Sequence, residues 1–290
     1  MSRPILVAVD DSPRAAMVLG AAGALAQKKN TSLIILRVVP PPMDIPAEAM
    51  TISPAEVTAM LVDDALAKLM KLRAAHLQNV ESKAVAQVGM PWESICEKAK
   101  QSDAQLIVMG SHGYDGFDRI LGTTAQKVVN NADRSVLVVR SDPPWTRIVC
   151  ALDGASSTHA VFEAATHLSA CFAAELTLLR AVIIPKIPNS VLPKGVNLEA
   201  LLFGAATAHA ATLQREAPKE MRVHTSVHVG DAREVIKREA AHASCVVMGA
   251  HGYNLRERFL GTTAAWVVNH LPSCVLVVRE PNPNEAITLS

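Results

Sequence analysis

Residues 107–140, IVMGSHGYDGFDRILGTTAQKVVNNADRSVLVVR, match residues 246–279, VVMGAHGYNLRERFLGTTAAWVVNHLPSCVLVVR, at 20 of 34 aligned positions. Matching of this extent at a fixed offset indicates an internal repeat. The chain is therefore a duplication, and its fold can be worked out from either copy.

The sequence before these two stretches repeats as well. Each copy opens with an apolar strand that runs into an aspartate, ILVAVDDS at 5–12 and RIVCALDGAS at 147–156. The signals that follow come in the same order in both copies: an Ala-rich helix (about 13–28 and 157–173), a second strand (32–39 and 175–184), a long helix (about 54–77 and 197–216), a third strand before Gly89 or Gly230, a short helix, a fourth strand (105–109 and 245–248), a helix (about 122–131 and 261–270) and a last strand (136–139 and 275–278). Alternating strands and helices with mostly apolar strands predict α/β domains, each a parallel sheet with helices on both faces.

The boundary between the copies is marked by Pro143 and Pro144. Proline cannot donate a backbone hydrogen bond, so this pair stops the preceding strand. We expect a first domain over residues 1–141 and a second over residues 146–280.

Composition narrows the function classes. Half of the 290 residues are apolar, and 28 basic residues balance 27 acidic ones. A nucleic-acid surface needs concentrated positive charge, and single-strand binding uses aromatic stacking, yet aromatics make up only 3%. The sequence therefore predicts a globular protein that does not bind nucleic acid.

The N-terminal apolar run stops at Asp10, which is too early for a signal peptide. The longest apolar stretch, Ala15 to Ala26, is shorter than the roughly 20 residues that cross a bilayer and is typical of a buried helix. The five cysteines form no CxxC pair, as expected of free thiols in a reducing compartment. We expect a soluble cytoplasmic protein without a membrane partner.

Two features of each copy follow the ends of strands, where parallel sheets bind ligands. One is the aspartate after the first strand, Asp10 or Asp153, and the other is the glycine loop, 110–124 or 249–263. If the first and fourth strands are neighbours, both features face one crevice. The carboxylate would then accept hydrogen bonds from a ribose or adenine, and the loop would bring backbone N–H groups to phosphate oxygens.

Each of these features also has a purely structural interpretation. The threonines at 123 and 262 begin a helix, where they fit a phosphate site and an ordinary cap equally well. Asp10 and Asp153 stand where an aspartate often caps the first helix. The residues alone leave both alternatives open.

The combination of an early aspartate with the pattern G-x2-G-spacer-G-[ST] after an apolar strand resembles the universal stress protein family. The resemblance covers residues 3–140 and 146–279, so the chain is similar to a tandem member. It implies flavodoxin/Rossmann-like domains, each with a five-stranded parallel sheet of order 3-2-1-4-5. It also implies ATP or AMP binding, with or without Mg²⁺, and pairing of domains through their fifth strands.

The resemblance assigns roles by position. Asp10 would contact adenine or ribose, Val38 would line the adenine pocket, Met109, Gly110 and Gly113 would follow the ribose and phosphates, and Gly122, Thr123 and Thr124 would hold the phosphates. The matching positions of the second copy are Asp153, Ala181, Met248, Gly249, Gly252, Gly261, Thr262 and Thr263.

Both copies depart from the family pattern, because eight residues instead of nine separate the second and third glycines (114–121 and 253–260). The second copy also carries Leu255 where the first has Gly116, together with Arg256 and Arg258. We therefore expect the first copy to hold the better site. His112 and His251 recur in these loops without further ligands spaced nearby, so no metal site is expected.

The leading hypothesis is a stress-response or signalling protein that binds adenine nucleotide without efficient turnover. The sequence has no Walker A lysine pattern, no nucleophile elbow and no repeated His–carboxylate pair. A slow ATPase and a ligand-free interaction module of the same fold are the alternatives. The apolar strands 136–139 and 275–278 favour a pseudo-twofold pairing of the two domains, and homodimerisation stays open.

Overall fold

The structure, a computed structural model, describes residues 3–41, 53–111, 121–154, 158–187, 193, 195–250 and 260–279. Contacts divide the chain into two units between Pro143 and Pro144. Strands and helices alternate through both units, so the expected α/β architecture is confirmed.

The first unit contains a parallel sheet whose strand order is β3-β2-β1-β4-β5. Its strands are β1 (Ile5–Ala8), β2 (Leu33–Val39), β3 (Ser82–Val88), β4 (Leu106–Gly110) and β5 (Ser135–Val139). Its helices are α1 (Ala15–Lys29), α2 (Pro54–His76), α3 (Pro91–Gln101) and α4 (Thr123–Asn131).

The second unit repeats this topology with the order β8-β7-β6-β9-β10. Its strands are β6 (Arg147–Leu152), β7 (Glu175–Val182), β8 (Val223–Val229), β9 (Cys245–Gly249) and β10 (Cys274–Val278). Its helices are α5 (Thr158–Phe172), α6 (Leu198–Glu216), α7 (Ala232–Glu239), the short 3-10 helix η2 (Ala240–His242) and α8 (Thr262–His270).

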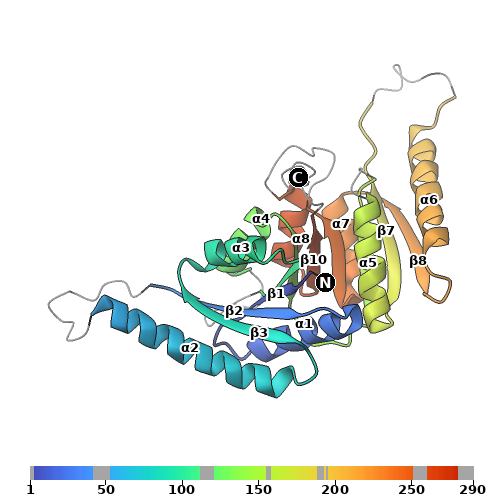
Figure 1. Cartoon of the computed structure of the whole chain (residues 1–290). Helices are drawn as coiled ribbons and strands as arrows, with labels where there is room; N and C mark the ends of the chain where they lie inside the picture. Colours follow the sequence, from blue (N-terminus) through green and yellow to red (C-terminus); the bar gives the residue numbers. More distant parts are fainter. Residues whose placement is uncertain are drawn as a thin grey trace, which may run out of the picture. The chain divides into compact units, whose positions relative to one another are not determined.

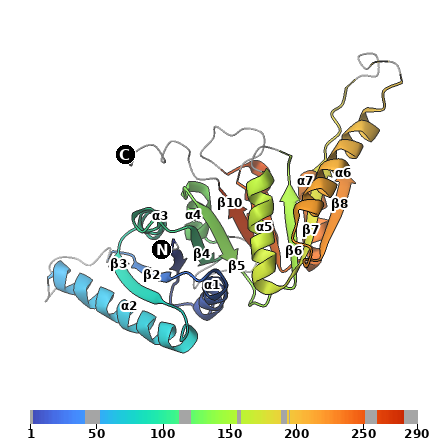
Figure 2. The same ribbon diagram turned by 45° about the vertical axis from the view of Figure 1, so that its right-hand side comes forward.

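Helices cover both faces of the sheet in the first unit. Helices α1 and α2 contact each other, as do α3 and α4, and Figure 1 shows the two pairs on opposite sides of the strands. In the second unit α7 contacts α8, and α6 runs beside β7 and β8 (Figure 2). This two-sided cover explains why the central strands of each sheet, such as β1, β4 and β9, are apolar.

The helices form where the sequence predicts them. Helix α1 contains the apolar stretch from Ala15 to Ala26, most of which is buried, and ends at Asn30 in a left-handed conformation. Helix α2 begins with a capping box, in which the Ser53 hydroxyl accepts from the Glu56 N–H (3.2 Å) and the Glu56 carboxylate accepts from the Ser53 N–H (2.8 Å). Pro54 at the first helical position suits this start.

Within the described residues, no helix is both long enough and apolar enough to span a membrane.

We expect Ile5→Ala to destabilise the first unit by about 2–5 kcal/mol, because Ile5 lies fully buried in the central strand and its loss leaves a cavity. Met60→Ala, at a side chain that is 63% exposed on α2, serves as the control and should change stability by less than about 0.5 kcal/mol. Urea unfolding measures both. Equal effects of the two substitutions would contradict the placement of β1 in the core.

Candidate functional site

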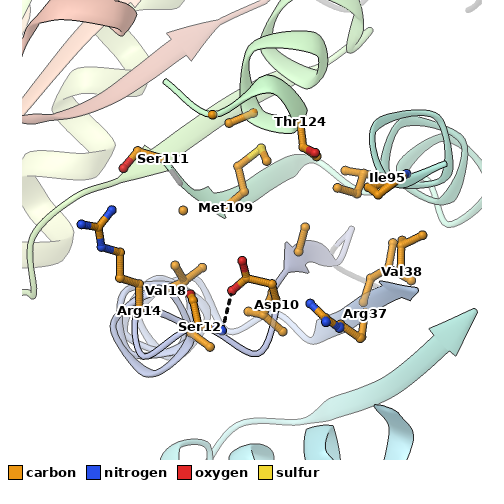
Figure 3. Close-up of a pocket in the computed structure, with 18 of the residues that line it drawn as sticks. Asp10, Ser12, Arg14, Val18, Arg37, Val38, Ile95, Met109, Ser111 and Thr124 are labelled. Carbon is orange, nitrogen blue, oxygen red and sulfur yellow. Dashed lines mark hydrogen bonds between the residues drawn. The ribbon is translucent and has the colours of Figure 1, made fainter. Parts of the chain in front are cut away.

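A cavity of about 650 Å³ opens in the first unit at the carboxyl ends of β1, β2 and β4 (Figure 3). The starts of α1, α3 and α4 complete its walls. Seven of the eight residues that the sequence assigned to this site line the cavity: Asp10, Val38, Met109, Gly110, Gly122, Thr123 and Thr124. The eighth, Gly113, lies outside the described residues.

Strand register explains how distant positions meet here. Ala8, the last residue of β1, is paired with Leu36 on one side and with Met109 on the other. Asp10 follows β1 by two residues, and Val38 lies two residues beyond Leu36. The pairing of β1 with β4 thus brings Asp10 and the described ends of the glycine loop to one cavity.

Asp10 forms a local turn and does not cap the first helix. Its Oδ1 accepts a hydrogen bond from the Ser12 N–H at 3.0 Å (Figure 3). Helix α1 begins later, with Arg14 at its N-cap and no side-chain cap. The capping alternative is therefore wrong for Asp10, because the chain needs a turn of its own between β1 and α1.

The two ends of the glycine loop are held together by backbone. The Gly122 N–H donates to the Ser111 carbonyl at 2.8 Å, and in the second unit the Gly261 N–H donates to the Ala250 carbonyl, also at 2.8 Å. Residues 112–120 and 251–259 between these ends, including Gly113, Gly252 and most of the shortened spacer, lie outside the described residues.

No side chain in the described part of the chain caps the start of α4. Gly122 is its N-cap residue, with φ −61° and ψ 150°, and Thr123 and Thr124 are the first helical residues. Helix α8 begins in the same way at Gly261, followed by Thr262 and Thr263. The capping interpretation of these threonines is therefore wrong, and in the first unit the N-terminal turn of α4 lines the cavity.

The sequence did not single out the rest of the wall. Val18, Leu36, Pro91 and Ile95 supply apolar surface, and Arg14 supplies a guanidinium from the start of α1. Pro91 opens α3 directly after the turn that follows β3, and this helix-start signal was the one available indication. The others meet only through packing.

An ion pair lies at the edge of the cavity. Arg37, the charged residue of the apolar strand β2, places Nη2 3.0 Å from Oδ2 of Asp11. Lys68 of α2 lies 3.9 Å from the same oxygen and 2.7 Å from Asp64. Asp11 therefore neutralises Arg37 inside the first unit.

The second unit holds its assigned residues at equivalent places. Asp153 follows β6 and accepts a hydrogen bond from the Thr158 hydroxyl at 3.3 Å. Met248, which is paired with Ala151 of β6, and Gly249 end β9. Ala181 lies in β7, next to Arg180.

The described residues contain no group of three or more His, Cys, Asp or Glu side chains placed to hold a metal ion. His112 and His251 lie outside those residues. All five cysteines are free thiols, and Cys150, Cys245 and Cys274 are buried. Burial raises the pKa of the Cys150 thiol, which makes it a poor nucleophile.

Comparison with known proteins identifies the family. The model of the Universal stress protein family matches residues 1–140 and again 144–279, so this chain belongs to that family as a tandem member. It is 30% identical over 138 residues to a universal stress protein of Mycolicibacterium smegmatis, an alignment that covers 47% of this chain and 45% of that relative. The chain thus spans about half the length of that relative.

A solved structure of the family shows the same fold. A universal stress protein from Archaeoglobus fulgidus superimposes with a TM-score of 0.69 at 17% identity, covering 96% of this chain and 98% of that one. Another from the same organism, in complex with dAMP, covers 47% of this chain and 95% of that one at 23% identity and a TM-score of 0.32. Its ligand is a property of that protein.

We expect a thiol reagent to separate the cysteines by burial. In the native protein Cys96 and Cys171, both half-buried, should react first, whereas Cys150 should react only after unfolding because its thiolate is disfavoured. Absorbance of released thionitrobenzoate, with mass spectrometry of the labelled peptides, gives the order. Rapid native labelling of Cys150 at neutral pH would show that β6 is not buried.

Proposed function

We propose that this protein is a stress-response or signalling protein whose first unit binds an adenine nucleotide, ATP or AMP, in the cavity at the ends of β1, β2 and β4. The observation that carries the proposal is the convergence of seven separately assigned residues on one cavity. Its volume of about 650 Å³ lies within the range of about 300–1,000 Å³ typical of small-molecule sites.

The base and ribose would lie between Asp10 and the apolar wall. Val38, Ile95 and Met109 offer surface to a flat aromatic ring, and the carboxylate of Asp10 offers an acceptor to a hydroxyl or amino group. Asp10 is held by the Ser12 N–H, so its side chain is oriented before a ligand arrives.

The phosphates would lie at the start of α4. The first N–H groups of a helix have no intrahelical partner, and at α4 no side chain of the described residues caps them. The positive end of the helix dipole favours an anion at the same place, and Arg14 adds a cation to the cavity wall.

Binding without efficient turnover is part of the proposal. Phosphoryl transfer needs metal ligands and a positioned nucleophile. The carboxylates of the described cavity wall are Asp10 and Asp11, and Asp11 is already engaged by Arg37 and Lys68. A Mg²⁺ ion carried by ATP would therefore find few protein ligands here.

The second unit would offer a second nucleotide site at Asp153, Ala181, Met248, Gly249, Gly252, Gly261, Thr262 and Thr263. We also propose that the two domains pair about a pseudo-twofold axis within the chain.

Two measurements test nucleotide binding. The purified protein is denatured and the supernatant analysed for adenine nucleotide, and ATP and AMP are titrated separately by calorimetry. We expect bound nucleotide or measurable heat from the unmodified chain. The absence of both would overturn the proposal, whereas steady phosphate release from ATP that Asp10→Ala abolishes would overturn binding without turnover.

Substitutions locate the site within the first unit. We expect Gly122→Leu to abolish nucleotide binding by the first unit, because the backbone angles at Gly122 suit any residue and the substitution adds bulk to the cavity wall. Asp10→Asn should weaken the same step by about tenfold through loss of a charged acceptor. Gly20→Ala is the control, since a Cβ placed there meets no atom within 4 Å. Wild-type binding by Gly122→Leu would refute the proposed location.

A further inference from the structure

The two units differ in charge at one equivalent position. Arg180 stands in β7 where Arg37 stands in β2, since the pairing of Ile148 with Leu176 repeats that of Ile5 with Leu33. Counting from the same register, the position of Asp11 is occupied by Gly154. The second unit thus keeps the arginine and lacks the carboxylate that pairs with it in the first.

The guanidinium of Arg180 lies against the backbone of Gly154. A Cβ placed on Gly154 would come within 2.6 Å of Cζ of Arg180, so the side chain occupies space that any larger residue would need. Gly154 also has a φ of +75°, a left-handed conformation that glycine adopts without strain. Both properties set the guanidinium at the carboxyl end of β6, directly after Asp153.

No partner satisfies Arg180 within the described residues. Its Nε and Nη1 are removed from solvent without a hydrogen-bond acceptor. Arg37 also leaves Nε unbonded, but its charge is balanced by Asp11 at 3.0 Å. Two of the three guanidinium nitrogens are thus withdrawn from water without an opposite charge among the described residues, which is costly, so the Arg180 side chain favours an anion.

The described carboxylates around Arg180 either have another partner or lie away from its guanidinium. Asp153 accepts from Thr158, and Glu175, at the far end of β7, pairs with Arg222 at 3.0 Å. The acidic residues of α6, Glu199 and Glu216, stand at its two ends, whereas α2 carries Asp64 in its middle.

We propose that the second unit binds the anionic group of a small ligand, a phosphate or a carboxylate, at Arg180. In the first unit the carboxylate of Asp11 takes the place of this anion beside Arg37. A guanidinium offers a planar pair of N–H groups that matches either oxyanion in a bidentate fashion. This anion site adjoins the second nucleotide site proposed above, since Gly154 and Arg180 neighbour Asp153 and Ala181 in the chain, but binding of a free anion requires no adenine.

Nuclear magnetic resonance of the arginine Nε–H groups tests the site directly. The Arg180 signal is assigned by its loss in Arg180→Gln and Arg180→Lys, the second variant keeping the charge should the first fail to fold. Inorganic phosphate is then titrated into the full chain at constant ionic strength. We expect the Arg180 signal to shift and saturate while the Arg37 signal does not. An unresponsive Arg180, or equal responses from Arg180 and Arg37, would overturn the proposal.

The first unit supplies a matched control. Asp11→Gly removes the carboxylate that pairs with Arg37 and leaves a glycine there, as beside Arg180, so the Arg37 signal should then respond to phosphate with an affinity at least about tenfold above that of the unmodified unit. An unchanged Arg37 response would show that the missing carboxylate does not create the site.

Separate titrations distinguish the sources of the anion. Acetate tests a carboxylate, and AMP against adenosine tests a phosphate carried by a nucleotide. Responses to phosphate or acetate alone would place a free anion at Arg180, and a response to AMP but not adenosine would place a nucleotide phosphate there. Inorganic phosphate and acetate contain no base, so a lack of response to them would not contradict ATP binding measured by calorimetry. Likewise, a lack of ATP binding would not contradict a response of Arg180 to these anions.

Discussion

The parallel pairing of β1 on both of its edges is the constraint on which the first unit depends. All four residues of β1 are buried, with β2 on one side and β4 on the other. Parallel neighbours cannot be joined by tight hairpins, so the chain must cross over through helices in both directions. The crossovers on the two sides of β1 run in opposite directions along the sheet. Between them the carboxyl ends of the strands stay uncovered, and the cavity lies there.

The same constraint made the fold readable from the sequence. Strands that are buried on both faces appear in the sequence as continuous runs of apolar residues. The repeat presents every helix and strand twice, so each could be recognised from either copy. The cap at Ser53 and the stop at Asn30 are local signals with local causes. Element positions therefore followed from short-range chemistry.

The cavity was predictable only in part. Asp10, Met109 and Gly122 carry signals, because Asp10 comes two residues after β1, Met109 lies at the end of β4, and Gly122 precedes α4. Ile95 and Val18 carry none, since an apolar residue that lines a cavity looks in sequence like one that fills a core. The sequence could not decide whether Asp10 caps a helix. The answer depends on where α1 begins, and in the structure it begins at Ala15, seven residues after β1 ends at Ala8.

Membership of the universal stress protein family accounts for the fold that both units share, but it does not account for the charged residues in which they differ. The contrast between Asp11 and Gly154 has a consequence for how the two copies diverge over time. Replacing an aspartate by glycine requires no change of backbone conformation. The opposite change would put a Cβ at φ +75° and against the guanidinium of Arg180, so it needs a second adjustment. Divergence at this position therefore runs more easily in one direction than back.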